Sequence, residues 1–196
     1  MALTLQDFQQ GAYGQGGELL DWTYYSTTIL ANGTTVHNLF SAAVGQTFEG
    51  TVQTLDLTNM QSAGTIPQAQ NLLVEALKFF YTGHAAFNNA ALLAFYLLLE
   101  QTTVEIQIAS KYVIGQWTLQ ELFGISTAIN LVPTTAGDNV PMVEPNYHGI
   151  FPLNVPIILP ALTTFKVIVT HQTASAAALN GDFLKVGLNG RLLRGA

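Results

Sequence analysis

The side chains best suited to metal binding or catalysis are four histidines, and they are scattered along the chain. They are His37, His84, His148 and His171. No His-x-His pair and no helical His-x₃-His pair occurs, although such spacing commonly brings two imidazoles onto one metal ion. We therefore interpret the histidines as loop and strand-end residues and expect neither a zinc site nor a dioxygenase-type centre. A metal cluster assembled from distant segments is the alternative.

Carboxylates and glycines offer other kinds of site, none with a complete motif. Asp138 and Glu144 in a long loop could supply calcium ligands, but they lack the dense Asp/Asn spacing of a dedicated calcium loop. The stretch GAYGQGG at 11–17 is not followed by the Lys-Ser/Thr of a phosphate loop. No G-x-S-x-G is present, and nothing singles out two of the acids for glycoside hydrolysis. We expect no catalytic residue, no cofactor, no metal and no enzyme activity.

Half of the six Lys and Arg residues lie in one C-terminal stretch, FLKVGLNGRLLRG at 183–195. They are Lys185, Arg191 and Arg194. Alternating Leu and Val predict a strand over 182–188 with Lys185 on its outer face. Asn189-Gly190 is then expected to turn the chain off the sheet, leaving both arginines on a short tail. On this interpretation, deleting 191–196 leaves the monomer folded.

A tail of this kind suits contacts between subunits. The guanidinium group of an arginine can donate two hydrogen bonds to a carboxylate or to the C-terminal backbone carbonyls of a neighbouring subunit. The alternative is a tail that is exposed to solvent. Trp22, Tyr24 and Tyr25 could form an aromatic shelf for a partner or a sugar, or could pack in the core. The candidate inter-subunit contacts are Arg191, Arg194, Lys185, Trp22 and Tyr24.

Most of the elements that must position these residues are predicted to be strands. Asn32-Gly33 within 22–39 predicts a hairpin, and 70–83 fits either a strand or a helix. Alternating or β-rich stretches predict strands over 47–57, 102–115, 155–160, 164–171 and 182–188. One helix is expected at 88–100, where Asn88 or Asn89 can cap an Ala/Leu run. The stretch 132–149 is a long Pro/Gly-containing excursion.

Composition limits the classes of function. Only 9% of the 196 residues are charged, against roughly 25% in ordinary soluble domains, and mean hydropathy is +0.32. Scarce charge favours a subunit whose surface is hidden in an assembly. A net charge of −6 argues against nucleic-acid binding, so we expect negligible affinity for duplex DNA. The chain has no cysteine, which excludes disulfides and thiolate metal sites.

Membrane insertion and secretion are not expected. The longest apolar run, AALLAFYLLL at 90–99, is about half the length that a membrane-spanning helix needs. The N-terminus has no basic region followed by an apolar one, so no secretory signal is visible. We expect an N-terminal arm and hairpin over 1–45 and a main domain over 46–196, which together make one domain.

The pattern of strands and turns in this sequence resembles that of a known protein family. The two closing stretches are VPIILPALTTFKVIV at 155–169 and DFLKVGLNGRLLRG at 182–195. They resemble the end of the single jelly-roll major capsid proteins of tailless icosahedral bacteriophages. The segment 57–80 resembles the place where those proteins end one strand and begin the next, and 102–123 resembles their central strand and its exit; the likeness extends over about 50–115 and 150–195. The resemblance predicts that residues 70–81 form a strand.

The resemblance implies an all-β fold: an eight-stranded jelly-roll sandwich with one inserted α-helix and long loops. It also implies a virion structural protein that assembles with copies of itself, with other virion proteins or with an internal viral membrane. The alternative is a jelly-roll carbohydrate-binding module or a spike or receptor-binding module, because a fold does not determine a function.

Overall fold

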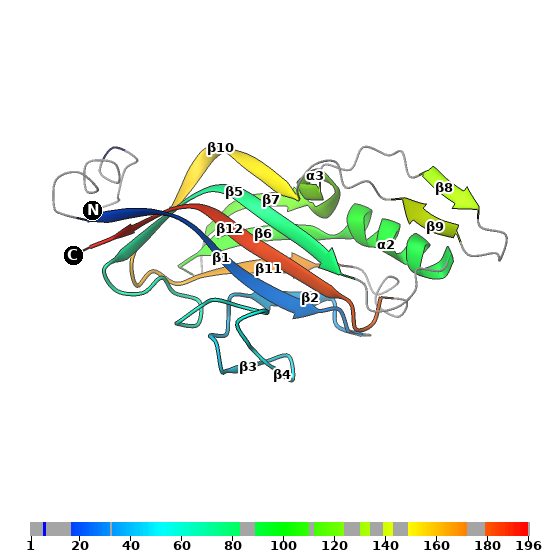
Figure 1. Cartoon of the computed structure of the whole chain (residues 1–196), viewed down its shortest axis with the longest axis horizontal. Coiled ribbons are helices and arrows are strands. Elements are labelled where there is room, and N and C mark those ends of the chain that lie inside the picture. The colour runs from blue at the N-terminus through cyan, green and yellow to red at the C-terminus, as the bar shows by residue number, and fades with distance from the viewer. Residues whose placement is uncertain are drawn as a thin grey trace.

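The protein is a two-layer sandwich of antiparallel β-sheets in a computed structural model (Figure 1). The structure describes residues 6, 17–31, 33–82, 89–109, 112–123, 130–133, 139–142, 149–171 and 179–195. In spatial order, the first sheet contains β1 (Glu18–Ile29), β12 (Phe183–Arg194), β5 (Gln70–Thr82) and β10 (Ile150–Leu159). The second contains β2 (Val36–Leu39), β11 (Phe165–Thr170), β6 (Thr103–Ile108) and β7 (Tyr112–Thr118). The expectation of a mainly β protein is therefore confirmed.

The eight sandwich strands pair in a nested order. In chain order they are β1, β2, β5, β6, β7, β10, β11 and β12, and the first pairs with the last, β1 with β12. The second pairs with the seventh, β2 with β11, and the third with the sixth, β5 with β10. The two middle strands, β6 and β7, pair with each other. The chain is thus arranged like a long hairpin rolled into two sheets, which are completed by the pairings β12–β5 and β11–β6.

The core lies between the two sheets and is almost entirely apolar. The first sheet contributes Leu77 and Phe79 of β5 and Leu184, Val186 and Leu188 of β12. The second contributes Val104, Ile106, Val167 and Val169. Because alternate strand residues face the same side, each strand buries one face here.

The strand β5 contains an extra residue that explains its ambiguous sequence. Asn189 of β12 pairs with Ala76, whereas the next residue, Gly190, pairs with Val74. Glu75 is therefore left over as a β-bulge, and the alternation of β5 changes sides there. After the bulge Leu77 and Phe79 face the core, and before it Val74 does. Of the stretch 70–83, which fitted a strand or a helix, residues Gln70–Thr82 form a strand.

The strand β12 continues where the sequence predicted a turn. It runs through Asn189-Gly190 to Arg194 and pairs with β1 along its whole length. The predicted short tail is therefore wrong, and both arginines are strand residues. The physical reason is burial, since Leu192 and Leu193 would be exposed to water on a tail but are buried in the strand. Deleting 191–196 would remove part of the fold.

Three other predicted strands differ in their connections. The 22–39 hairpin is wrong because β1 and β2 belong to different sheets, and each has a longer partner in β12 or β11. The 47–57 strand is interrupted at Glu49 and Gly50, which have positive φ, so it forms only β3 (Thr47–Phe48) and β4 (Thr51–Val52). The single strand over 102–115 is the hairpin β6–β7.

Two helices lie in the described part of the chain. The predicted one is α2 (Asn89–Gln101), and a second, α3 (Leu119–Phe123), was not predicted. Thr118 and Glu121 cap α3 reciprocally: the Thr118 N–H donates to Glu121 Oε2 at 2.8 Å, and the Glu121 N–H donates to Thr118 Oγ1 at 3.3 Å. This T-x-x-E pattern is a capping box. Within the long excursion, β8 (Asn130–Pro133) pairs with β9 (Asn139–Met142).

Candidate functional site

The three C-terminal cations all contact groups of their own chain. Arg191 makes a bidentate ion pair with Glu75, the bulged residue of β5. Arg194 lies 4.0 Å from the carboxylate of Glu18, the first residue of β1 and its partner in the β1–β12 ladder. Lys185 donates to the Asp56 carbonyl at 2.6 Å, and its Nζ lies 4.9 Å from the centre of the Tyr25 ring. These cations support the pairing of β1, β12 and β5 within the monomer.

The two aromatic candidates on β1 differ in exposure. Tyr24 is buried in the core, and its hydroxyl donates to Gln70 Oε1 at 2.9 Å. Burial raises the pKa of this hydroxyl. Trp22 is 37% exposed and packs edge-on against Tyr24, with ring centroids 6.1 Å apart. Of the five predicted contact residues, Tyr24 therefore offers the least surface to a partner.

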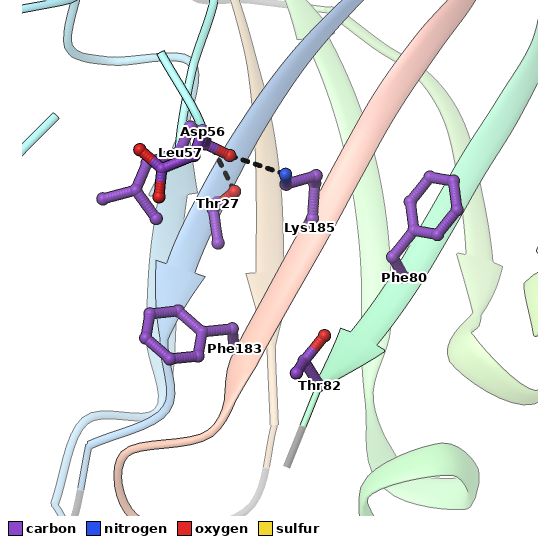
Figure 2. Close-up of a pocket in the computed structure, with 7 residues that line it drawn as sticks. All are labelled: Thr27, Asp56, Leu57, Phe80, Thr82, Phe183 and Lys185. Carbon is purple, nitrogen blue, oxygen red and sulfur yellow. Dashed lines mark hydrogen bonds between the residues drawn. The ribbon is translucent and has the colours of Figure 1, made fainter. Parts of the chain in front are cut away.

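A shallow groove of about 440 Å³ lies on the outer face of the first sheet (Figure 2). Two phenylalanine rings and two threonine hydroxyl groups give it a mixed character. It is lined by Thr27, Asp56, Leu57, Phe80, Thr82, Phe183 and Lys185. Two hydrogen bonds fasten the 56–57 loop to its floor, from Lys185 to the Asp56 carbonyl and from Thr27 to the Leu57 carbonyl at 2.8 Å. The groove can stack a flat or apolar ligand and offer it hydroxyl groups.

The free edge of β1 is covered by the chain itself. The Asn59 side chain accepts from the Tyr25 N–H at 2.9 Å and donates to the Thr23 carbonyl at 2.8 Å. The Thr58 hydroxyl donates to the Tyr25 carbonyl at 2.9 Å, and Thr58 also forms a bridge with Ser26. These bonds protect the Thr23–Ser26 part of the β1 edge from pairing with another strand.

The opposite side of the sandwich is apolar. There β10 ends the first sheet and β7 ends the second, and a groove of about 510 Å³ lies between them. Among the described residues, none that lines it is charged; they are Ile114, Trp117, Phe151, Leu153, Asn154, Val155, Pro156, Ile157 and Ile158. We call these nine residues the β7–β10 side. Trp117 and Phe151 pack edge-on across it, with ring centroids 6.2 Å apart.

Both strands of the β7–β10 side contain bulges. In β7, Val113 pairs with Gln107 and Gly115 pairs with Ile106, so Ile114 between them is the extra residue of a bulge. In β10 the pairing with β5 is interrupted between Pro152 and Ile157, and Val155 within this interruption is 78% exposed. Proteins commonly use bulges and charged side chains to keep edge strands from pairing with other chains. Here the bulges push apolar side chains into solvent, which is typical of a surface that a partner covers.

A polar cluster lies where β1 ends and β2 begins; its Thr28, His37 and His171 are buried, and the side chain of its Glu49 is 28% exposed. We call Thr28, His37, Glu49 and His171 the histidine cluster. The rings of His37 and His171 are nearly parallel, with centroids 5.3 Å apart, and their Nε2 atoms are 3.2 Å apart. The Nδ1 atom of His37 lies 3.0 and 3.1 Å from the two Glu49 oxygens. The Thr28 hydroxyl donates to Glu49 Oε2 at 2.7 Å.

The electrostatics of the cluster identify the donors. Burial raises the pKa of Glu49, but the hydrogen bonds from His37 and Thr28 outweigh it, and the pKa is lower than the ordinary value. Glu49 is therefore an ionised acceptor, and His37 Nδ1 donates to it. The sequence interpretation, which took the histidines as scattered, missed this cluster.

The remaining predicted sites lie outside the described residues: His84, His148, Asp138, Glu144 and most of the glycine-rich 11–17. Within the described part of the chain, no three His, Cys, Asp or Glu side chains are grouped to hold a metal ion. In the same residues no helix is long and apolar enough to cross a membrane. Comparison with protein-family models, curated proteins and solved structures finds no match for the chain.

Proposed function

We propose that the chain is a jelly-roll subunit of an icosahedral virion shell, where it assembles with copies of itself and with other virion proteins. The nested pairing of the eight strands supports the jelly-roll assignment, because a jelly roll consists of eight strands folded as two Greek keys. The resemblance of 57–80, 102–123 and the two closing stretches to phage capsid proteins supports the virion role.

The observation that carries the assembly proposal is the β7–β10 side. The described residues that line this groove are uncharged, and apolar bulges on two edge strands border it, which suits burial against another protein. The partner we propose is a second copy of this chain. In each copy β7 and β10 contain no charged residue. Two copies that meet through these strands would therefore bury no unpaired charge from them. The chain as a whole is only 9% charged.

A carbohydrate-binding or receptor-binding module is the second candidate. The groove of Figure 2 favours it, because Phe80 and Phe183 provide apolar rings and Thr82 provides a hydroxyl group beside them. Such a module would bind a glycan saturably as a small monomer. It would not need a second copy on the β7–β10 side.

Native mass spectrometry and electron microscopy of the purified chain test the proposal. We expect symmetric oligomers or shells, and Val155→Lys and Ile114→Lys should each shift the mass distribution towards monomer. Val52→Lys is the matched control, because Val52 is an apolar residue of β4, 56% exposed, outside the β7–β10 side. A parent protein that stays monomeric at high concentration and binds a glycan through Phe80 would contradict the shell role. Equal assembly of all three variants would contradict this interface.

A further inference from the structure

The part of β10 that projects from the β7–β10 side is bracketed by two prolines. Four residues, 153–156, have no partner in β5, where only Glu75 lies between the corresponding pairs. The strand therefore arches away from β5 at this point (Figure 1). Pro152 precedes the unpaired residues and Pro156 is the last of them, and a proline has a fixed φ and no N–H for a ladder. We call residues 152–156 the arch, and we regard it as a preformed protrusion.

The centre of the arch is Asn154, the one residue of the β7–β10 side whose side chain both donates and accepts hydrogen bonds. Its carboxamide is exposed and makes no hydrogen bond with the described part of the chain. In the free subunit, water satisfies this group. A partner that covers the arch removes the water, and a buried amide without hydrogen bonds is costly. The partner must therefore offer a donor and an acceptor at this position.

A second Asn154 offers both groups. A carboxamide has an oxygen that accepts and an NH₂ group that donates, so two carboxamides that face each other can exchange two N–H···O bonds. A two-fold axis between identical copies brings each residue near the axis against its own counterpart. A carboxylate or an ammonium group at this position would instead meet a like charge. The amide at the centre of the arch therefore suits contact with a second copy of itself.

We propose that two copies meet across a two-fold axis that passes beside Asn154, with the two arches antiparallel and the two carboxamides hydrogen-bonded to each other. This inference rests on the proposed function, in which the β7–β10 side binds a second copy, and it adds the residue that determines the register. The contact also buries Val155, which is 78% exposed in the free subunit. Apolar surfaces tolerate many registers, whereas a single buried amide pair is satisfied in only one.

The two strands around the arch suit a two-fold contact along their length. Val113 of β7 and Ile150 of β10 are 51% and 44% exposed, so exposed apolar side chains continue beyond the groove on both strands. Neither strand contains a charged residue that the axis would bring against its own copy. The interface would thus have one amide pair at its centre and apolar contacts around it.

Disulfide trapping tests the position of the axis, because the chain has no cysteine and one introduced thiol reports one contact. Asn154→Cys should form a covalent dimer under mild oxidation, since a disulfide needs Cα atoms about 4.4–6.8 Å apart. Non-reducing electrophoresis and intact-mass measurement give the linked fraction at a concentration where the parent is assembled. Ile114→Cys, on the same side but on β7, and Val52→Cys, on β4 outside this side and 56% exposed, are the matched controls. Both should stay largely unlinked.

Two further variants test the amide pair by sedimentation velocity and native mass spectrometry. Asn154→Asp keeps the size of the side chain but places two ionised carboxylates against each other at neutral pH, so the Kd of self-association should rise at least about tenfold. Asn154→Leu should still assemble, but into a broader distribution of oligomers, because no amide pair selects the register. Residue 154 is exposed in the free subunit, so circular dichroism should show an unchanged fold in both variants.

The outcomes separate this inference from the proposed function. A parent protein that stays monomeric at high concentration would overturn both. Assembly that Val155→Lys disperses, but in which Asn154→Cys stays unlinked and Asn154→Asp associates like the parent, would overturn the two-fold contact and leave the β7–β10 interface in place. Linking of Ile114→Cys or Val52→Cys as complete as that of Asn154→Cys would also overturn the contact, because the disulfides would then report random collisions.

Discussion

Replacing Gly190 with alanine should destabilise the sandwich more than any ordinary Gly→Ala change in a strand. Gly190 lies in β12 where the bulge of β5 brings the two backbones close together. A Cβ at this position would lie 1.9 Å from the Leu73 carbonyl oxygen and 2.9 Å from the Glu75 nitrogen. Both atoms belong to the backbone, so no side-chain rotation can relieve the overlap.

The expected cost follows from what must move. The two strands have to separate by more than 1 Å to restore a normal contact, which weakens the neighbouring hydrogen bonds of the β12–β5 ladder. Forcing an extra carbon into a packed site costs about 1–3 kcal/mol, and each backbone hydrogen bond lost adds about 1 kcal/mol. We therefore expect the free energy of unfolding to fall by roughly 3 kcal/mol or more.

Urea denaturation followed by circular dichroism measures this change, with the m-value showing whether unfolding remains two-state. Gly115→Ala is the matched control, because Gly115 also lies beside a bulge, in β7. There the three atoms nearest to the added Cβ all belong to the Trp117 ring, the closest at 2.0 Å, and a partly exposed side chain can move aside. The control should cost at most about half as much. Equal losses in the two variants, or a Gly190→Ala protein as stable as the parent, would refute the reasoning.

Two further predictions concern the end of β12. Leu192→Ala should lower the free energy of unfolding by about 2–5 kcal/mol in the same urea assay, because the side chain is 1% exposed within the core; a loss below 1 kcal/mol would restore the idea of a dispensable tail. A double-mutant cycle of Glu75→Gln and Arg191→Met should give a coupling under about 1 kcal/mol that weakens with salt, because both side chains are more than a third exposed; a larger, salt-independent coupling would contradict the surface character of this pair.

The elements predicted best from the sequence are those whose structure depends mainly on their own residues. Alternation in Val104 and Ile106, or in Leu184 and Val186, reports directly which face of a strand is buried. The Ala/Leu run of α2 reports helix propensity in the same local way. The helix α2 was therefore predicted nearly at its observed bounds, whereas β6 and β12 were predicted correctly at their first residues but not at their last. The capping box at Thr118 is equally local, and it was available in the sequence as a signal for α3.

The features that sequence reasoning missed depend on which strands are neighbours. The bulge at Glu75 follows from the fit of β5 against β12, about 110 residues later in the chain. Without that pairing, the change of face within 70–83 looks like a weak helix pattern. Asn189-Gly190 likewise has the composition of a turn, yet a long antiparallel ladder and two buried leucines keep it extended. Local turn propensity is a weaker effect than the burial of a whole strand end.

The burial of the two imidazoles of the histidine cluster could have been predicted from the local sequence pattern. His37 is two residues before buried Leu39, and His171 is two residues after buried Val169, so strand alternation alone places both imidazoles on core-facing positions. A core-facing imidazole needs a hydrogen-bond partner, because an unpaired polar group in an apolar interior is costly. The sequence therefore contained the evidence that each histidine had a buried partner. It could not identify the partners, since His37 and His171 meet only because β2 pairs with β11, and Glu49 reaches them from a hairpin whose position no alternation reveals.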